Sequence, residues 1–488
     1  MRLSYLFNAV SLIFFYIGIV AFSPAIVSLI YQEYNSAIPF VITGILSGLI
    51  GLFLKLVVNR FLPQDKMTDI KKSEGLTIVL LSWLVFSVIA SIPYLFFNFS
   101  VENAFFEGIS GATTTGATIL THYDYPKALF FWRSLTQWLG GMGIIVLFIA
   151  VLPQFAVAGR QMFFAEAPGP TEDKLTPRIK NTATALWGLY VILTLIQIGL
   201  LVYFKMPLFD AICNSFSTIS SGGFSPNPQS IAGYGSLPVM WVIIVFMFFS
   251  GCNLALVYRV LTKFKYSLIW KNEEFKTYLK IIVLVSLSVF GILFLNTHQH
   301  TLEQFTNSVF TVLSIMTSTG FASCDYSAWS VSAQIMLFIV ILFGSSAGST
   351  GGGIKIMRAL IVFKYLKREL VKLLHPNAVI TIKMDNVTVA PYIVSQIIAF
   401  IMFYIAVFII SGLVVSIIES NVVIGFGGSM ATLSIIGPAF GHVIGPAGNY
   451  ESLSAVTKLI FMFNMLIGRL ELIPFLILLN KDYWSIKR

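Results

Sequence analysis

Charged residues are scarce in this sequence. Only 11% of its 488 residues are Asp, Glu, Lys or Arg, whereas 57% are hydrophobic, and the mean hydropathy is +0.86. A water-soluble fold could not cover so much apolar surface with so few charges, which excludes a soluble protein and predicts a polytopic protein within the lipid bilayer. The connections between the apolar runs reach only about 25 residues, too few for a soluble catalytic domain.

Cysteine and histidine are scarce as well. The three cysteines, Cys213, Cys252 and Cys324, are widely spaced, so they form neither a disulfide framework nor a metal site. The five histidines all lie in connections between the apolar runs. An intramembrane serine protease, whose motif GISG at 108–111 fits, would need a base beside its serine within the membrane. We therefore expect no enzyme and no organic cofactor.

Positive charge is in excess. Lys and Arg outnumber Asp and Glu by 31 to 21, a net charge of +10. The basic residues lie in alternate connections, whereas connections 294–332 and 419–453 contain neither Lys nor Arg. This positive-inside pattern is typical of a multi-pass membrane protein and predicts that both termini are cytoplasmic. It accounts for the charge, so we expect no nucleic-acid partner. The basic clusters lie near 55–72, 160–180, 259–280, 355–383 and 481–488.

Apolar runs of about 20 residues predict ten membrane spans. The predicted spans lie near 3–31, 37–58, 75–98, 128–155, 182–204, 236–260, 279–296, 332–366, 390–418 and 455–480. An even number agrees with two termini on the same side of the membrane. We expect an all-α polytopic membrane protein whose first two spans form an N-terminal transmembrane hairpin over residues 1–70.

Four of the outward connections repeat one pattern, a half-length apolar helix followed by a glycine-bearing turn. The turns align as Thr114-Thr115-Gly116, Ser220-Ser221-Gly222, Ser318-Thr319-Gly320 and Ile435-Ile436-Gly437. The aligned glycines recur at roughly 100 residues, as expected for an internal repeat. We therefore expect four span, pore-helix, span units around a central pseudo-fourfold pore. The predicted units are 71–157, 178–265, 277–372 and 388–488.

The repeated half-helices and turns are suited to conducting a cation. A half-helix that enters from outside and stops within the membrane points its C-terminal carbonyls, the negative end of its dipole, at the centre. The turn beyond it has non-helical backbone at membrane depth, which is tolerated where it lines a water-filled path. Glycine there allows φ > 0, so successive carbonyls can replace an ion's hydration shell. The aligned turn residues, including Ile436 and Gly437, therefore predict a cation filter.

A glycine-rich stretch, LFGSSAGSTGGGIKI at 342–356, lies between two apolar helical runs. It is a poor phosphate-binding loop because Lys355 lies between two isoleucines, and its flanks do not fit a nucleophile elbow. Its place midway through the third unit's second span predicts an intramembrane gate below the filter. The predicted gate residues are Gly344, Gly348, Ser349, Thr350, Gly351, Gly352, Gly353 and Lys355. The alternative is a packing role, since small residues let helices approach closely.

Arg469 lies near the middle of the last predicted span. An Arg at the bilayer centre costs about 2.5–3.5 kcal/mol on insertion scales, so it normally faces a cavity or a partner. We expect Arg469 to face an internal cavity rather than lipid. The alternative is a structural pair with a carboxylate such as Glu471.

Together these features resemble the Trk/Ktr/HKT superfamily of potassium transporters, and specifically its bacterial TrkH-type subunit. The resemblance covers nearly the whole chain, through the four units, the turns TTTGAT, SSGGFS, TSTGF and IIGPAFG, and the glycine-rich break. It implies potassium uptake across the bacterial inner membrane, potassium at the filter carbonyls, a homodimer and a cytosolic nucleotide-binding partner of the TrkA type. It also implies that the loop obstructs the pore and that Arg469 faces the pore under the filter as part of the gate.

One turn departs from the pattern, and one other function stays open. Ile436 stands where the other turns carry Ser or Thr, so the fourfold symmetry is imperfect. Broken helices also occur in sodium- or proton-coupled secondary transporters, which are the alternative function. Four parallel turns favour the pore.

Overall fold

The chain forms a helical membrane protein. The computed structural model describes residues 3–61, 72–143, 179–297 and 302–470. Within these ranges six helices are long and apolar enough to cross a membrane, and a bent pair of helices provides a further candidate. The six cover Ser4–Ile30, Tyr34–Phe61, Glu74–Leu95, Ala183–Tyr203, Glu273–Asn296 and Pro391–Ile418. Five of them bury only 28–39% of their most apolar window, which leaves apolar surface for lipid, whereas Glu74–Leu95 is 72% buried.

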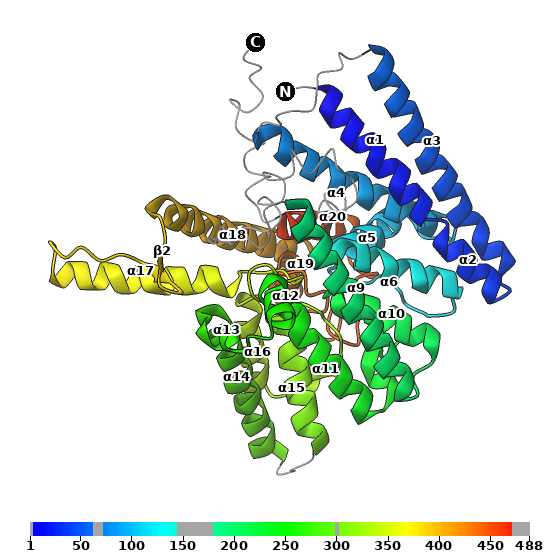
Figure 1. The fold of residues 1–488 in the computed structure, drawn as a ribbon. Helices are drawn as coiled ribbons and strands as arrows, with labels where there is room; N and C mark the ends of the chain where they lie inside the picture. Colours follow the sequence, from blue (N-terminus) through cyan, green and yellow to red (C-terminus); the bar gives the residue numbers. More distant parts are fainter. Residues whose placement is uncertain (1–2, 62–71, 144–178, 298–301, 471–488) are drawn as a thin grey trace.

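The N-terminal helices pack as an antiparallel pair at one side of the molecule (Figure 1). They are α1 (Leu3–Val20), α2 (Ser23–Ile30), the short η1 (Tyr34–Ser36) and α3 (Ala37–Phe61). Glycines allow the close approach of α1 and α3, because a Cβ on Gly18 would lie 3.0 Å from the carbonyl oxygen of Gly44. The pair also contacts the next helix, α4 (Lys72–Leu95). The residue boundaries that we predicted for this hairpin and the four units stay predictions.

A half-helix follows each of four long helices, α4, α9 (Ile179–Tyr203), α14 (Glu273–Thr297) and α18 (Pro391–Ile418). The half-helices are α5 (Val101–Ala112), α10 (Leu208–Ile219), α15 (Leu302–Met316), and the π-helical turn η4 (Val423–Gly427) continued by α19 (Gly428–Leu433). Ser100 caps α5, since its side chain accepts a hydrogen bond from the Asn103 N–H at 3.4 Å. The half-helices are buried toward their C-terminal ends, where all residues of α15 from Phe310 to Met316 are buried.

A second short helix then follows each half-helix. These are α6 (Lys127–Gly141), α11 (Leu237–Gly251), α16 (Val331–Leu342) and α20 (Ala455–Arg469), with 15, 15, 12 and 15 residues. Each is shorter than the roughly 20 residues that cross a bilayer. Short one-turn helices η2 (Ser230–Tyr234) and η3 (Tyr326–Ala328) precede α11 and α16.

The continuous span predicted for 236–260 is wrong. Helix α11 ends at Gly251, and α12 (Leu254–Lys263) leaves it at an angle of 102°. The physical reason is a new helix start, because the Asn253 side chain accepts a hydrogen bond from the Leu256 N–H at 3.1 Å and caps α12. The inner parts of the spans predicted for 128–155 and 455–480 lie beyond Gly143 and Leu470, outside the described residues.

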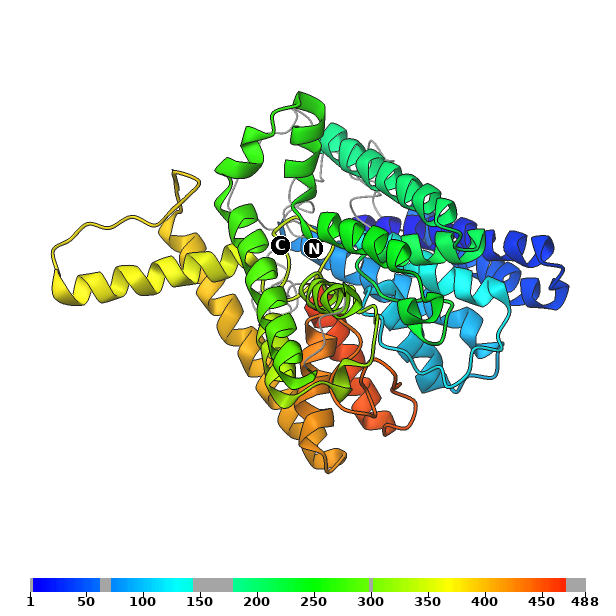
Figure 2. The same cartoon turned by 90° about the horizontal axis from the view of Figure 1, so that it is seen from below.

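Three of the short helices contact the half-helix of another repeat. Helix α6 contacts the second half-helix α10, α11 contacts the third half-helix α15, and α20 contacts the first half-helix α5. The last unit thus returns to the first. In the view turned by 90°, the N-terminal helices (blue) and the helix Ile356–Leu374 (yellow) lie at opposite sides of the molecule (Figure 2).

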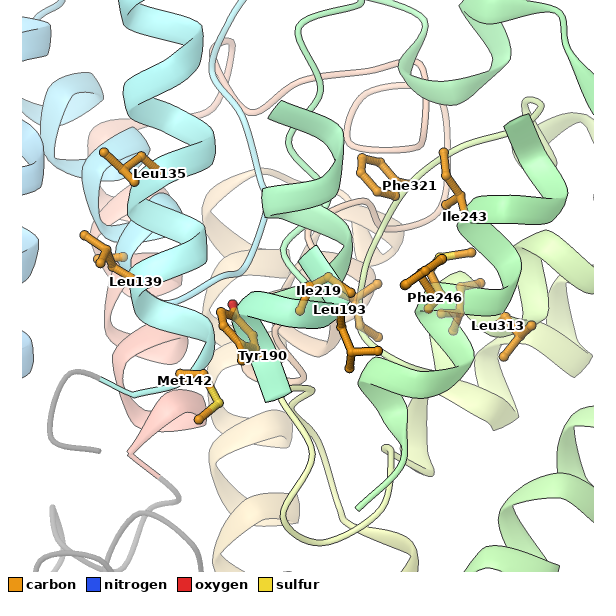
Figure 3. Packing of buried hydrophobic residues seen from close by; sticks show 14 of the residues in the cluster. Leu135, Leu139, Met142, Tyr190, Leu193, Ile219, Ile243, Phe246, Leu313 and Phe321 are labelled. Atoms are coloured by element: carbon orange, nitrogen blue, oxygen red, sulfur yellow. The ribbon is translucent and has the colours of Figure 1, made fainter. Parts of the chain in front are cut away.

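Apolar side chains from several units fill the space around the half-helices. Figure 3 shows Leu139 on α6, Tyr190 on α9, Ile219 at the end of α10 and Leu313 on α15 within one buried cluster. The Tyr190 hydroxyl donates a hydrogen bond to the Trp138 carbonyl at 2.9 Å, which satisfies its polar end within this apolar packing. Residues from distant parts of the chain therefore hold the half-helices in place.

A small hairpin is a departure from the all-α expectation. Helix α17 (Ile356–Leu374) and α18 extend to one side (Figure 1), and between them β1 (Lys383–Met384) pairs with β2 (Val387–Thr388). Asp385 in the turn accepts hydrogen bonds from the Glu273 N–H at 2.7 Å and from Nδ2 of Asn272 at 2.8 Å. The hairpin thus caps the start of α14, near the short α13 (Ser267–Lys271).

Candidate functional site

The four turns after the half-helices share one backbone conformation. We call them turn 1 (113–118), turn 2 (220–225), turn 3 (317–322) and turn 4 (434–439). Each has two residues with positive φ, separated by one residue. The pairs are Thr114 at 60° and Gly116 at 81°, Ser221 at 57° and Gly223 at 77°, Ser318 at 55° and Gly320 at 77°, and Ile435 at 59° and Gly437 at 85°. The predicted repeat is therefore present in the backbone itself.

The structure corrects the predicted alignment of turn 2 by one residue. The glycine with positive φ is Gly223, so Gly222 takes the position of Thr115, Thr319 and Ile436. The backbone hydrogen bond from the Gly222 N–H to the Ser217 carbonyl, at 2.8 Å, matches that from Thr115 to Ser110 in turn 1, at 2.9 Å. Residue types alone could not separate two adjacent glycines.

The same correction changes how turn 4 departs from the others. Ile436 now corresponds to Thr115, Gly222 and Thr319, so it no longer stands where every other turn carries Ser or Thr. Ile435 does stand at such a position, because it corresponds to Thr114, Ser221 and Ser318. We name the turn glycines Gly116, Gly223, Gly320 and Gly437.

The turn glycines close a ring. A Cβ on each of them would collide with a carbonyl of the following turn, closer than real Cβ atoms come. The collisions pair Gly116 with Gly222, Gly223 with Thr319, Gly320 with Ile436, and Gly437 with Thr115. Fourth and first turns meet in the same way as the other neighbours. Both the positive φ and the lack of space therefore require glycine at these positions.

Side chains of different kinds hold turns 1, 3 and 4. Ser110 donates to the Ala117 carbonyl in turn 1 at 2.6 Å, and Ser314 donates to the Phe321 carbonyl in turn 3 at 2.7 Å. In turn 4 the Tyr450 hydroxyl donates to the Gly437 carbonyl at 2.7 Å. Within the described residues the Thr114 hydroxyl is buried and makes no hydrogen bond.

A buried ion pair supports the end of turn 1, at Thr118 and Ile119, and was not predicted from the sequence. Arg133 on α6 and Glu107 on α5 lie 2.7 Å apart, with side chains 1% and 0% exposed. The carboxylate accepts hydrogen bonds from the Ile119 N–H at 3.0 Å and from the Thr118 hydroxyl at 3.1 Å. The guanidinium also lies 4.0 Å from the centre of the Phe224 ring in turn 2. The signal was an acidic and a basic residue within apolar helices.

The glycine-rich loop, residues 343–355, interrupts a helix as predicted. It leaves α16 after Leu342 and enters α17 at Ile356. Its ends are joined, because Phe343 pairs with Ile354 and the Gly344 N–H donates to the Ile354 carbonyl at 2.8 Å. The backbone has positive φ at Gly348 and Gly353, 74° and 73°.

The glycine-rich loop lies against three of the turns. Thr350 and Ser221 in turn 2 share a hydrogen bond of 2.8 Å between their hydroxyls, and the Gly352 N–H donates to Oγ of Ser318 in turn 3 at 2.7 Å. A Cβ on Gly352 would lie 2.6 Å from the Ser434 carbonyl oxygen and 2.9 Å from Cβ of Ile435 in turn 4. Only glycine fits between the loop and turn 4 at this distance.

The loop also fills the break between α11 and α12. The Ser346 N–H donates to the Gly251 carbonyl at 3.0 Å, and the Leu254 N–H donates to the Gly348 carbonyl at 3.2 Å. These bonds satisfy backbone groups that the interrupted helix leaves without partners. This break was not predicted from the sequence, although SGCN at 250–253 contains a small residue, a glycine and a capping Asn.

Lys355 stabilises the loop from within. Its ammonium donates to the Ser345 and Ser349 hydroxyls at 3.4 Å each and to the Gly351 carbonyl, and the residue is 5% exposed. Glu274 on α14 accepts a hydrogen bond from the Ala347 N–H at 2.6 Å. A buried cation and a buried carboxylate thus both bind the loop backbone.

Arg469, at the end of α20, joins the loop to another unit. Its guanidinium donates to the Thr350 carbonyl at 2.9 Å, to the Gly141 carbonyl at 3.0 Å and to the Gly140 carbonyl. It also lies 5.4 Å from the centre of the Trp83 indole. The Gly140 and Gly141 carbonyls lie at the C-terminal end of α6, the negative end of that helix dipole. Glu471, the alternative partner, lies outside the described residues.

Comparison with known proteins decides the family. A family model described as "TrkH: Cation transport protein" matches residues 41–486. The chain belongs to the TrkH family. The "Trk system potassium uptake protein TrkH" of Salmonella typhimurium is 37% identical over 467 residues, 94% of this chain and 95% of the relative. The protein of the same name from Vibrio parahaemolyticus is 35% identical over 495 residues, 99% of this chain and 100% of the relative.

A solved structure agrees with this TrkH assignment. The crystal structure of the potassium transporter TrkH from Vibrio parahaemolyticus matches with a TM-score of 0.87 and 33% identity, over 99% of this chain and 100% of that chain. It confirms the predicted all-helical, multi-span fold. Membership in the TrkH family also confirms the predicted resemblance and the expectation of a membrane transporter rather than an enzyme.

Proposed function

We propose that this chain takes up potassium through a central pore whose filter is the ring of turns 1 to 4. The observation that carries the proposal is the closed ring of contacts between each turn glycine and the carbonyl of the next turn. Four half-helices end at this ring, so the negative ends of their dipoles favour a cation there. The relatives named as potassium uptake proteins support potassium as that cation.

Potassium would bind to backbone carbonyls of the turns, which replace its hydration shell. The positive φ values at alternate positions support this, because they turn successive peptide groups in different directions. The predicted filter residues stay those of the four turns, with Gly223 added from the corrected register of turn 2.

The glycine-rich loop and Arg469 would form the gate beneath the filter. In support, the loop lies against turns 2, 3 and 4, and Arg469 binds the Thr350 carbonyl of the loop. Lys355 would hold the closed form of the loop through its own hydrogen bonds. Release of the Arg469 contact would let the loop move away from the ion path.

The proposal also covers the membrane in which the protein lies, its partner and its oligomeric state. The relatives are bacterial and are named as parts of a Trk system, which supports the bacterial inner membrane and a cytosolic TrkA-type nucleotide-binding partner. We propose a homodimer with both termini cytoplasmic, as the basic connections indicate.

The second candidate function is a sodium- or proton-coupled secondary transporter. It is favoured by two helix breaks in the described residues, after Gly251 and after Leu342, since coupled transporters bind substrate at broken helices. Potassium flux into liposomes, measured with no sodium and no pH gradient, tests both. Flux that follows the potassium gradient alone supports the pore. Flux that needs sodium or a pH gradient would support coupled transport instead.

A further inference from the structure

Gln137 on α6 holds turn 2 by two hydrogen bonds. Its Nε2 donates to the Gly222 carbonyl at 2.6 Å, and its Oε1 accepts from the Phe224 N–H at 3.1 Å. The two bonds bracket Gly223, whose φ is 77°, and the Gln137 side chain is fully buried. A residue of the first unit thus fixes the backbone of the second.

Turns 1 and 3 hold the same backbone with their own side chains. The residue that corresponds to Gly222 is Thr115 in turn 1 and Thr319 in turn 3. Their hydroxyls share hydrogen bonds with Thr113 at 2.8 Å and with Thr317 at 2.7 Å. Turn 2 has no side chain at this position, so this bond is missing there.

Turn 2 also lacks the support from its own half-helix. Ser217 corresponds in position to Ser110 and Ser314, which bind turns 1 and 3. Within the described residues, however, the buried Ser217 hydroxyl makes no hydrogen bond. Turn 2 therefore lacks both the threonine hydroxyl and the serine hydrogen bond that hold turns 1 and 3, and Gln137 supplies two hydrogen bonds in their place.

Gln137 also fills the space of the missing side chain. A Cβ on Gly222 would collide with Cδ of Gln137 and lie 2.5 Å from its Oε1. Gly222 does not have positive φ, so its backbone would accept a side chain if Gln137 were smaller. The amide therefore stands where a threonine side chain stands in turns 1 and 3.

We propose that Gln137 is a specificity-determining positioning residue of the filter. It gives turn 2 the conformation that the other turns obtain from their own hydroxyls. A carbonyl oxygen has two lone pairs, so the Gly222 carbonyl can accept from Gln137 and still face an ion. The proposal rests on the proposed function, because it assumes that the ring of turns selects the ion.

Gln137→Met tests the two hydrogen bonds, since Met keeps much of the volume and has no amide. Each neutral hydrogen bond changes a conformational population by roughly twofold to tenfold, so we expect the loss of both to lower the potassium over sodium preference by roughly fivefold to a hundredfold. The measurement is flux of each ion into liposomes, per folded protein. The matched control is Gln197→Leu on α9, also a fully buried Gln, whose amide makes no hydrogen bond within the described residues.

A double variant tests the geometry. Gly222→Thr alone collides with Gln137 and should lower the preference for potassium, as should Gln137→Ala alone. Combined, the two changes make room for a threonine that can bind Ser220 as Thr115 binds Thr113. We expect the double variant to recover most of the wild-type preference, so that each change is harmful alone and beneficial beside the other.

The outcomes separate the two proposals. If the wild type shows no selective potassium flux, the proposed function fails. If the wild type is selective and Gln137→Met equals it, Gln137 has no positioning role and this inference is overturned. Should Gln137→Met fail to fold, the double variant decides alone. Recovery of selectivity supports the inference, and selectivity no better than that of either single variant contradicts it.

Discussion

Arg469→Ala should raise cation flux through the proposed pore. In the wild type the guanidinium binds the Thr350 carbonyl of the glycine-rich loop at 2.9 Å and the Gly141 carbonyl of α6 at 3.0 Å. It therefore connects the loop to the end of a helix in another unit. Alanine removes both the connection and the positive charge beneath the ring of turns.

Loss of the hydrogen bond and loss of the charge should both raise cation flux. A hydrogen bond from a charged group contributes about 1.5–3 kcal/mol, so losing the bond to Thr350 should increase the displaced population of the loop roughly tenfold to a hundredfold. A guanidinium within about 6 Å of the ion path would add a barrier of roughly 3 kcal/mol at an effective dielectric of 20. Removing it should increase flux most at low ionic strength.

The assay is flux per correctly folded protein in liposomes, beside the melting temperature of each variant. Arg469→Lys keeps the charge but loses the planar fork, so it should stay closer to wild type than Arg469→Ala. Arg368→Ala on α17, where Arg368 pairs with the exposed Glu369, is the control and should leave flux unchanged. Normal flux in Arg469→Ala together with a lowered melting temperature would refute the barrier and show that Arg469 only holds the fold.

Three further predictions concern the turns, the loop and the buried pair. Serine at any turn glycine should reduce potassium over sodium discrimination in liposomes without preventing insertion, because its Cβ collides with the next turn; unchanged discrimination in all four variants would contradict the filter. Deleting 348–353 should raise basal flux, and a folded variant that is equally slow would support the packing role. Glu107→Gln should cost about 3–5 kcal/mol of unfolding free energy, because Arg133 stays buried without its carboxylate; a loss below about 1 kcal/mol in thermal unfolding would show that the pair matters little.

Local patterns in the sequence were sufficient to predict the half-helices, the turns and the glycine-rich loop. Each of these features depends on neighbouring residues, such as an apolar run that stops at a glycine where positive φ is needed. The register of turn 2 could not be predicted, because Gly222 and Gly223 can both adopt a positive φ. The hydrogen bond from the Gly222 N–H to the Ser217 carbonyl determines which of them does. The break after Gly251 was missed because an apolar run on both sides of it resembles one continuous span.

Contacts between units were beyond the reach of sequence patterns. Gln137 and Gly222 are 85 residues apart, and Arg469 and Thr350 are 119 residues apart. No periodicity links such pairs, and a Gln within an apolar span has no fixed partner until the units close into a circle. The charges of Glu107 and Arg133 were visible, yet only the fold shows that they pair and bind turn 1.

The ring explains why its four turns can differ in side chains while sharing one backbone. Each turn glycine touches a carbonyl of the next turn, so the circle closes only when all four have the same shape. The side chain that holds this shape differs from turn to turn. It is Ser110 in turn 1, Gln137 in turn 2, Ser314 in turn 3 and Tyr450 in turn 4. It follows that a change at one support alters the contacts of both neighbouring turns. Loss of the Gln137 bond frees the Gly222 carbonyl, which Gly116 touches, so its effect on selectivity should extend beyond turn 2.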